Sequence, residues 1–389
     1  MRSVDIVIVG GGMVGLALAT QLADSPFSIA LINQGQISKE LTGIAEPRVS
    51  AINLASEAML KGNGAWQHIN HQRSNAYLKM DVWDKDSFGR IGFSHKETQF
   101  SHLGHIIENQ NVVNGLYEIA KQQSNLTLLE DVHIKRLDLN EQMVLMHFSD
   151  DQLLSAKMVV GADGANSMVR KVAKLPISFW SYDQSAIVAT VQTQEVHQRV
   201  ARQAFMPTGP LAFLPLANDK QCSIVWSQDT ESAQSLMALS DQDFNRHLAT
   251  ALNMQLGPCE LLSKRHCIPL TMRYARQWLG QRSVIIGDAA HTIHPLAGQG
   301  VNLGFQDALS LANTLSEIDT ELLGSKQVLR AFERERKAEA AKMVATMEGF
   351  KQLFAGNNPL KKLVRGAGLS LFDNLSPVKQ ALINNAMGL

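Results

Sequence analysis

The sequence predicts an α/β fold in which a parallel-sheet domain holds an inserted antiparallel sheet and is followed by a helical C-terminus. Three observations carry this prediction. A β-branched strand runs into a glycine-rich turn at the N-terminus, short strand-like runs occupy the middle, and a helical pattern begins at Gln327. With 389 residues the chain is long enough for two packed cores, since single cores stop growing at roughly 250–300 residues.

The composition is that of an ordinary globular protein. Hydrophobic residues make up 45% of the chain and charged residues 19%, which argues against disorder. Because Lys plus Arg equals Asp plus Glu at 36 each, we expect no nucleic-acid partner. Cys222, Cys259 and Cys267 show no metal-ligand spacing, so we expect reduced thiols and no metal site. No run of about 18 apolar residues occurs, so we expect at most peripheral contact with a membrane.

The first chemical signal is the G-x-G-x-x-G pattern that follows the N-terminal strand. Residues 4–9 form a continuous apolar run, and a helical pattern follows the glycines. Gly10 permits a tight turn, Gly12 lets the backbone approach a pyrophosphate, and Gly15 lets the helix pack on the strand. The pattern predicts a Rossmann-like dinucleotide site, and a glycine-rich turn without a ligand is the plainer alternative.

A second strand, over residues 27–32, follows at the spacing expected of such a site. A carboxylate usually stands at its end to bind the ribose hydroxyls, but this chain has Asn33 there. An amide can still hydrogen-bond a hydroxyl, although without the strength of a charged acceptor. Asn33 therefore stays a candidate for the ribose contact.

Two later strands also end in turns that carry an aspartate. Residues 158–162 lead into Asp163 and Gly164, a pair that is also common in plain turns. Residues 283–286 lead to Asp288, whose carboxylate is placed to accept a hydrogen bond from a sugar-like hydroxyl. The second of these turns is the more specific signal.

The chain beyond this aspartate enters a helix through a glycine-rich start. Pro295 interrupts the chain, and Gly298, Gln299 and Gly300 precede a helical pattern over residues 301–315. The exposed amides of a helix start form an electropositive site. Such a site would stabilise the negative charge of a reduced flavin, which favours FAD over NAD as the bound dinucleotide.

Together these blocks resemble the FAD-binding pattern of the p-hydroxybenzoate hydroxylase class of flavoprotein monooxygenases. The resemblance implies a Rossmann-like FAD-binding domain of that type, an inserted antiparallel-sheet substrate domain and a helical C-terminus. With Asn33 included, the residues expected to bind FAD are Gly10, Gly12, Gly15, Asn33, Arg48, Asp163, Gly164, Asp288, Pro295, Gly298, Gln299, Gly300, Val301 and Asn302. By the resemblance, Asp288 binds the ribityl chain and residues 298–302 lie under the flavin ring. Arg48 is expected to contact FAD, and the plainer alternative is that it forms a salt bridge at the surface.

A narrower resemblance concerns the ubiquinone-biosynthesis hydroxylases. Residues 294–304, with Asp307, fit their signature, and residues 48–53, 82–89 and 101–106 resemble those acting on 2-polyprenylphenols. It implies hydroxylation of the 2-octaprenylphenol to 2-octaprenyl-6-hydroxyphenol type, with NADH or NADPH as hydride donor and O₂ as oxidant. The expected partners are the lipophilic phenol and other proteins of ubiquinone biosynthesis. The expected location is the cytoplasm, with peripheral contact at the inner membrane.

Other functions that the same fold supports stay open at this point. A different ubiquinone-ring hydroxylase, a flavin reductase or a halogenase would share most of these motifs. A halogenase would be expected to show a W-x-W-x-I motif, and Trp226 has no partner of that kind. A non-catalytic protein would be expected to have lost its glycines or Asp288, and all are present.

The domains are expected to be discontinuous in sequence. Residues 1–75, 100–178 and 271–389 are assigned to the FAD-binding domain with its C-terminal helices, and residues 76–99 and 179–270 to the substrate domain. Strand-like runs are expected at residues 81–83, 186–192, 201–206, 211–216 and 223–227, with a helix near 241–252. Residues 350–372 mix apolar and basic positions, which is typical of a helix packed on the domain or of one resting on a membrane or partner.

The sequence does not single out a general base for the phenol. The candidates are the histidines and the proline that follows one of them: His102, His105, His291, His294 and Pro295. Each of the histidines can equally be structural or part of the flavin surroundings. Five apolar residues are candidates for a channel that holds the polyprenyl tail, with the core of the substrate sheet as their alternative: Phe205, Leu211, Phe213, Leu214 and Trp226.

Overall fold

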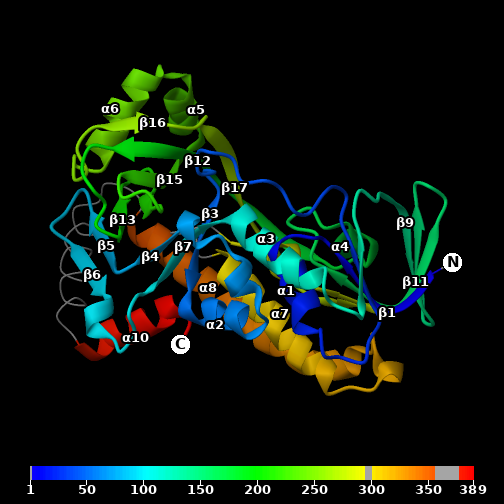
Figure 1. The fold of residues 1–389 in the computed structure, drawn as a ribbon. Helices are drawn as coiled ribbons and strands as arrows, with labels where there is room; N and C mark the ends of the chain where they lie inside the picture. Colours follow the sequence, from blue (N-terminus) through cyan, green and yellow to red (C-terminus); the bar gives the residue numbers. More distant parts are fainter. Residues whose placement is uncertain (1, 294–299, 355–375) are drawn as a thin grey trace.

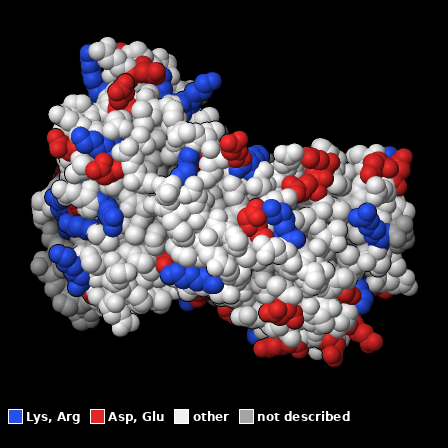
Figure 2. Space-filling view, viewed as in Figure 1, with Lys and Arg blue, Asp and Glu red and all other residues white. Residues whose placement is uncertain are grey.

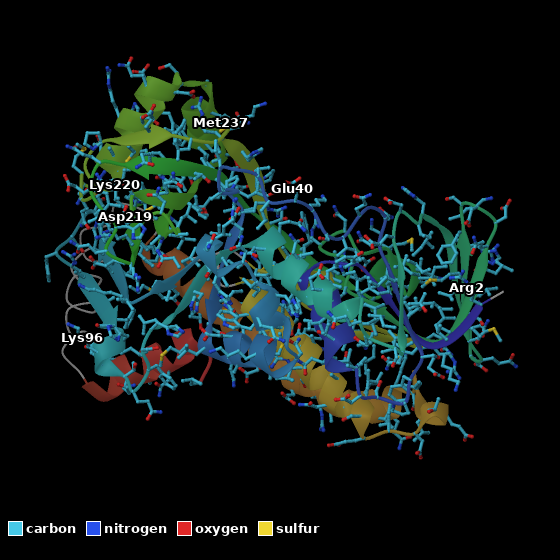
Figure 3. All side chains as sticks on the ribbon, in the orientation of Figure 1. Arg2, Glu40, Lys96, Asp219, Lys220 and Met237 are labelled. Carbon is cyan, nitrogen blue, oxygen red and sulfur yellow. The ribbon has the colours of Figure 1, made fainter. Side chains whose placement is uncertain are left out.

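The computed structural model describes residues 2–293, 300–354 and 376–389, and it shows two sheets joined side by side (Figure 1). Long helices run along the first sheet, and two short helices lie at the far end of the second sheet. Arg2, on the first sheet, lies at the right of the view, and Met237, in the helices beyond the second sheet, lies near the top (Figure 3). Charged side chains of both signs are scattered over the face drawn in Figure 2, in keeping with a net charge of zero.

The first sheet has a parallel centre, as the apolar N-terminal run predicts. Its strands run in the order β18-β19-β11-β1-β2-β8, and β1 pairs in parallel with both β2 and β11. An antiparallel hairpin, β9-β10, is attached to β11. The bounds are β1 Arg2–Val9, β2 Ile29–Ile32, β8 Leu126–Leu129, β9 Ile134–Leu139, β10 Val144–Phe148, β11 Leu153–Gly161, β18 Leu279–Gly280 and β19 Ser283–Ile285.

Helices cover this sheet and bury its central strands. Ile6, Ile8 and Leu31 have no accessible surface, because apolar side chains from helices such as Leu16 of α1 and Phe305 of α7 pack against the sheet. The helices of this region are α1 Met13–Gln21, α3 Asn109–Ala120, α4 Met168–Val172, α7 Gly300–Ser316 and α8 Lys326–Phe354. The helical C-terminus expected from Gln327 is thus confirmed as far as residue 354.

The second sheet contains the strand runs expected of an inserted domain. Its order is β20-β17-β12-β15-β14-β13-β5-β6, with β16 beside β12. The bounds are β5 Lys79–Asp84, β6 Arg90–Ser94, β12 Ile177–Thr193, β13 Val200–Phe205, β14 Leu211–Pro215, β15 Gln221–Asp229, β16 Cys259–Leu261, β17 His266–Ala275 and β20 His291–Thr292. Two helices, α5 Thr230–Ala238 and α6 Asp241–Ala251, connect β15 to β16. The domain boundaries themselves stay a prediction.

The second sheet is antiparallel, as expected, except at one pair of strands. β5 and β13 are parallel, from the pair Val200 and Lys79 to the pair Phe205 and Asp84. Neighbours joined by a hairpin must run antiparallel, whereas β5 belongs to a separate stretch of chain and is free of that constraint. The strand expected at residues 81–83 is present as part of β5.

A small third sheet lies between the two larger ones. It has the order β3-β7-β4, with bounds β3 Val49–Asn53, β4 Ser74–Tyr77 and β7 Gly104–Glu108. Asn53 accepts a hydrogen bond from the Ser56 amide and so caps α2, Leu54–Gly62. The last helix, α10 Ser376–Met387, buries Ile383 and Met387 against this sheet. Of the amphipathic stretch expected at 350–372, residues 355–372 lie outside the described residues.

Short 3-10 turns complete the elements, at Ala65–His68, His71–Arg73, His95–Glu97, Gly287–Ala289 and Thr320–Leu322. In the described part of the chain, no helix combines the length and apolarity that crossing a bilayer requires.

Candidate active site

A cavity of about 430 Å³ lies where the two larger sheets meet. Its wall combines the glycine turn after β1, the turn after β11, the turn after β19, the start of α7, and apolar residues of the second sheet. The lining residues are Gly12, Met13, Val14, Pro47, Arg48, Val49, Ser50, Asn109, Ala162, Gly164, Ala186, Val188, Val225, Ile268, Pro269, Leu270, Thr271, Ile286, Gly287, Asp288, Thr292, Ile293, Gly300, Val301 and Gly304. Chain segments far apart in sequence therefore form one site.

The three glycines of the first turn differ in what surrounds them. Gly10 has φ +113°, and a Cβ there would lie 2.3 Å from the carbonyl oxygen of Ala162. A Cβ on Gly15 would lie 1.9 Å from the carbonyl oxygen of Gly10. At Gly12 a Cβ would meet nothing within 4 Å, and this glycine lines the cavity. Gly10 and Gly15 thus permit the fold of the turn, and Gly12 leaves open the space beside the backbone.

Asn33 holds the glycine turn in place. Its Oδ1 accepts from the amide of Gly11 at 3.1 Å, and its Nδ2 donates to the carbonyl of Gly35 at 2.7 Å. Asn33 does not line the cavity. One N–H and one lone pair of its amide remain for a ribose hydroxyl, so that contact stays a prediction.

Asp163 and Gly164 close the second turn. Asp163 Oδ2 accepts from the amides of Met168 at 2.6 Å and Val169 at 3.2 Å, at the start of α4. Its Oδ1 is buried and has no hydrogen-bond partner among the described residues. Gly164 has φ +75° and leaves open space toward the cavity. A buried oxygen without a partner next to such an opening is suited to a bound polar ligand.

Arg170 joins the second turn to the third. This buried side chain donates to the carbonyl of Ala289 at 2.7 Å and to that of Ala165 at 2.7 Å. Burial, followed by the nearby Arg273 charge, lowers the pKa of its guanidinium. Arg170 was not predicted from the sequence, because nothing local connects it to a turn that lies more than a hundred residues away.

Asp288 projects into the cavity from the third turn. Its side chain is exposed to the cavity, and protein atoms surround it on its other sides. This burial raises the pKa of the Asp288 carboxyl above its ordinary value of 3.8, and His291 and Arg48 partly offset the effect. A ligand hydroxyl donating to Asp288 would restore some of the hydrogen bonding that burial removes.

The start of α7 also faces the cavity. A Cβ on Gly300 would meet nothing within 4 Å, and Val301 lines the wall. Asn302 is buried, donates to the carbonyl of Ala51 at 2.8 Å and accepts from the amide of Asn53 at 3.2 Å. Its side chain therefore links α7 to β3, and the predicted contact of Asn302 with FAD stays a prediction. His294, Pro295, Gly298 and Gln299 lie outside the described residues.

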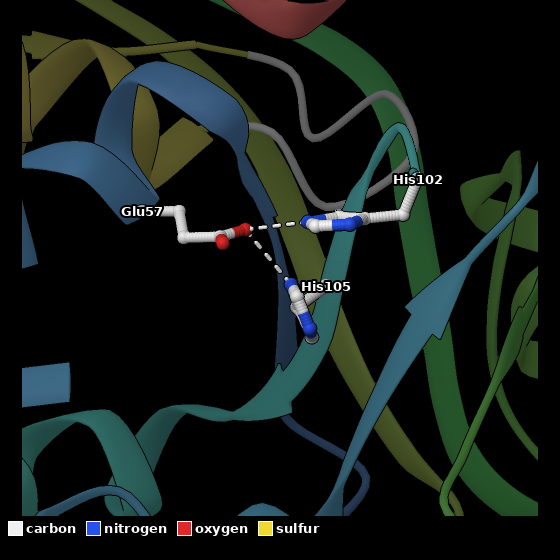
Figure 4. A group of neighbouring side chains, drawn as sticks. All are labelled: Glu57, His102 and His105. Atoms are coloured by element: carbon white, nitrogen blue, oxygen red, sulfur yellow. Dashed lines mark hydrogen bonds and ion pairs between the residues drawn. The ribbon is translucent and has the colours of Figure 1, made fainter. Parts of the chain in front are cut away.

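The histidines proposed as bases do not reach the cavity where the structure describes them. His291 is 2% exposed, and its Nε2 bonds to Asp307 Oδ2 at 2.5 Å. His102 and His105 both bond to Glu57 (Figure 4). None of the three lines the cavity. Their positions favour the structural alternative.

The apolar wall of the cavity consists of strand residues that no sequence motif marks. On β12, Ala186 and Val188 line the cavity, whereas Ile187 between them packs under α5 and α6 with Trp226. Val225 of β15 pairs with Val188 and faces the same way. Both faces of these strands are apolar, so the alternation gives no signal of which face carries the site.

The five residues proposed for a channel are core residues. Leu211, Phe213 and Trp226 belong to the cluster under α5 and α6, and Phe205 and Leu214 are also buried. None lines the cavity described above. The alternative role, the core of the substrate sheet, therefore holds for these residues: Leu211, Phe213 and Trp226 pack under α5 and α6, and Leu214 packs on the other face of the sheet with Val49 and Ala51.

A second cavity, of about 720 Å³, adjoins the first. The two share Pro47, Arg48, Val188 and Ile268, and Arg48 is exposed where they meet. The remaining lining residues are Thr42, Ile44, Ala45, Glu46, Leu262, Ser263, His266 and Cys267. The site thus has one part between the glycine turns and the sheet, and another beyond Arg48.

A family model described as an FAD binding domain matches residues 3–347. The chain belongs to this family. The match extends over all three turns, the inserted sheet and the start of the C-terminal helices. The family match therefore supports FAD as the bound dinucleotide.

Curated relatives cover nearly the whole chain. The 3-demethoxyubiquinol 3-hydroxylase of Escherichia coli is 32% identical over 99% of this chain and 98% of its own length. The mitochondrial ubiquinone biosynthesis monooxygenase COQ6 of Homo sapiens is 32% identical over 97% of this chain and 91% of its own. The ubiquinone hydroxylase UbiL of Rhodospirillum rubrum is 31% identical over 99% and 89%. The chain is an FAD-dependent hydroxylase.

Solved structures share the fold at lower identity. The p-nitrophenol 4-monooxygenase PnpA of Pseudomonas putida superposes with a TM-score of 0.81 over 100% of this chain and 99% of that chain, at 18% identity. PqsL of Pseudomonas aeruginosa, a probable FAD-dependent monooxygenase, superposes with a TM-score of 0.77 over 95% and 100%, at 19% identity. These structures confirm the predicted fold class.

The residues of this FAD-dependent hydroxylase fit the cofactor. Gly12, Gly164 and Gly300 leave open space along the cavity, so a bound dinucleotide can approach three backbone segments. Asp163 Oδ1 lacks a partner that a polar ligand would supply, and the Asp288 carboxylate can accept from a hydroxyl. These positions would hold FAD along the wall opposite Val188 and Val225.

Proposed function

We propose that the chain hydroxylates the aromatic ring of a polyprenylphenol in ubiquinone biosynthesis, with NADH or NADPH as the hydride donor. One atom of O₂ enters the ring and the other leaves as water, while the nicotinamide cofactor is oxidised. The supporting observation is the cavity, in which the glycine turns and Asp288 face an apolar wall of Ala186, Val188 and Val225. Such a wall suits an aromatic ring beside the flavin.

Bound FAD supplies the oxygen-activating chemistry, and the chain's residues bind, orient and exclude water. Val188 and Val225 are adjacent on neighbouring strands, so together they can hold a flat ring against the flavin site. Thr271 and Thr292 line the same cavity and offer hydroxyls to the phenol. No described histidine lines this cavity, so the phenol O–H would donate a hydrogen bond to a threonine hydroxyl or to water.

The second cavity supports the assignment of a lipophilic substrate. Ile44, Ala45 and Leu262 provide apolar lining beyond Arg48, and Val188 and Ile268 belong to both cavities. A ring in the first cavity can extend a prenyl tail into the second. We therefore propose that the tail passes Ile268, in place of the channel first expected around Phe213 and Trp226.

The position of hydroxylation is proposed as the 6-carbon of a 2-polyprenylphenol, following the local sequence resemblance. The name of the Escherichia coli relative, 3-demethoxyubiquinol 3-hydroxylase, supports a second candidate substrate, a demethoxyubiquinol. Both candidates share the tail and the cavity. They differ in the ring substituents that the apolar wall must accept.

Purified flavin-loaded protein, incubated with each of the two ring substrates, tests the proposal. We expect NADH or NADPH oxidation to accelerate with the preferred ring and a hydroxylated product to appear by mass spectrometry. Product from 2-polyprenylphenol supports the first assignment, and product only from a demethoxyubiquinol supports the second. Nicotinamide oxidation that yields peroxide alone with both substrates would contradict the proposal.

We also propose that the protein works at a membrane surface with other ubiquinone-biosynthesis proteins, since a polyprenyl tail partitions into lipid. Flotation with vesicles of neutral and anionic lipid tests this. Recovery of the protein with the vesicles is the expected result, and complete exclusion from both compositions would contradict it.

A further inference from the structure

A group of three metal-ligating side chains lies apart from the flavin cavity. Glu57 Oε2 is 2.8 Å from His102 Nε2 and 2.9 Å from His105 Nδ1 (Figure 4). The three ligand atoms all lie within 4.8 Å of one another. Neither histidine is fully buried, so an ion can reach them from solvent.

The fold brings these residues together through Gly104. Residues three apart on one regular strand point to opposite faces, but His102 lies before β7, whose first residue is Gly104. Gly104 has φ +155°, and a Cβ there would lie 2.4 Å from the carbonyl oxygen of Ile52. The turn at this glycine lets both rings face Glu57 on α2 while β7 stays paired with β3.

The two carboxylate oxygens of Glu57 have different partners. Glu57 is 4% exposed, and Lys61 Nζ lies 2.7 Å from its Oε1. Its Oε2 faces the two imidazoles of His102 and His105. Oε2 is therefore the carboxylate oxygen that an ion between the histidines would meet.

We propose that Glu57, His102 and His105 bind a divalent transition-metal ion, with Zn²⁺ as the best match. Imidazole nitrogen with carboxylate oxygen is a ligand set that zinc accepts, with water in the fourth position. Ligand atoms around a tetrahedral zinc lie about 3.3 Å apart, given bonds of about 2.0–2.1 Å. The group needs to open by about half an ångström to admit the ion.

Metal binding through Nε2 requires the proton of the His102 ring to lie on Nδ1, and Ser101 lies beside that nitrogen. When Nε2 binds the ion, the imidazole proton resides on Nδ1. Ser101 Oγ lies 2.9 Å from that nitrogen and can accept the proton's hydrogen bond. Metal-bound histidines typically have such a partner on the second nitrogen. The bound ion would link α2 to the start of β7. Asn53, the residue that caps α2, donates from its backbone amide to the side-chain oxygen of Asn302 on α7.

The test uses untagged, flavin-loaded protein that has been treated with chelator and dialysed. Titration with Zn²⁺ by calorimetry should show one saturable site per chain, and the melting temperature should rise with bound zinc. His102→Ala and His105→Ala should each weaken binding by at least the about 10–100-fold that loss of an outer-shell partner causes. His105→Cys retains a zinc ligand and should restore part of the affinity.

His71→Ala is the matched control. The His71 ring packs on Trp66, as the His105 ring does, but His71 is not one of the three proposed ligands. Flavin absorbance and circular dichroism of every variant establish that it is folded. No saturable zinc site in the parent protein, or equal weakening by His71→Ala and His102→Ala, would overturn the proposal and leave a hydrogen-bonded group only.

Discussion

Arg336 of α8 and Asp307 of α7 form a buried ion pair, with 2.9 Å between Arg336 Nε and Asp307 Oδ1. The other oxygen of Asp307 accepts from the amide of Gly287 at 3.0 Å and bonds to His291 at 2.5 Å. One carboxylate therefore connects two helices with the turn that carries Asp288. This arrangement positions the Asp288 side of the flavin cavity.

Arg336→Leu should destabilise the protein strongly. The substitution leaves the Asp307 carboxylate buried without its cationic partner, and breaking such a pair costs about 3–5 kcal/mol. Urea unfolding followed by circular dichroism measures the loss. Arg334→Leu, two residues away on the exposed side of α8, is the control and should change stability little. Equal stability of the two variants would show that the pair contributes nothing.

Gly12 and Gly15 should respond differently to alanine. A Cβ on Gly12 enters open space that the pyrophosphate of FAD would occupy, so Gly12→Ala should fold and lose flavin. A Cβ on Gly15 would meet the Gly10 carbonyl at 1.9 Å, so Gly15→Ala should lower the stability of the apoprotein itself. Flavin absorbance per chain and the melting temperature of flavin-free protein separate the two effects. Full flavin content in folded Gly12→Ala would contradict this account of the site.

Asp288→Asn should stabilise the flavin-free protein while it weakens FAD retention. The folded pKa of Asp288 is raised above 3.8, so its favourable contribution is present below 3.8 and is lost as the pH rises through the raised value. Near pH 7 the ionised carboxylate is unfavourable, and the neutral amide avoids that cost. The melting temperature of the apoprotein variant should exceed that of the parent at pH 7, and the difference should shrink toward pH 4. A lower melting temperature of the variant at pH 7 would contradict the prediction.

Substitutions at the neighbouring residues Ile187 and Val188 should have different effects, because Ile187 lies in the core and Val188 lines the cavity. Ile187→Ala removes a side chain packed under α5 and α6, which costs about 2–5 kcal/mol. Val188→Ala faces an existing cavity and should cost clearly less. Val188→Phe should raise the KM for the phenol with flavin content unchanged, because the larger ring fills the substrate side. The account fails if Ile187→Ala alters KM and Val188→Phe does not.

The local parts of this fold could be predicted from sequence. The run before Gly10 and the glycines after it define a strand, a turn and a helix within a few residues, and β1 and α1 follow that pattern. Asp288 was selected because it directly follows a short apolar strand. Such signals are local, so distant parts of the chain do not alter them.

The parts that depend on distant partners could not be predicted. Arg170 reaches Ala289, and Glu57 meets His102, only because the sheets bring these segments together. The cavity wall was also missed, because strand alternation predicts two faces but not which face meets the flavin. Val188 and Ile187 are equally apolar, and the neighbouring sheet alone distinguishes them.

Isotopically labelled O₂ tests the central claim most directly. Purified flavin-loaded protein, with NADH or NADPH and a polyprenylphenol, should yield a ring-hydroxylated product that carries one labelled oxygen atom. Label absent from the product, or present only in peroxide under each substrate tried, would contradict the assignment of this cavity to aromatic hydroxylation.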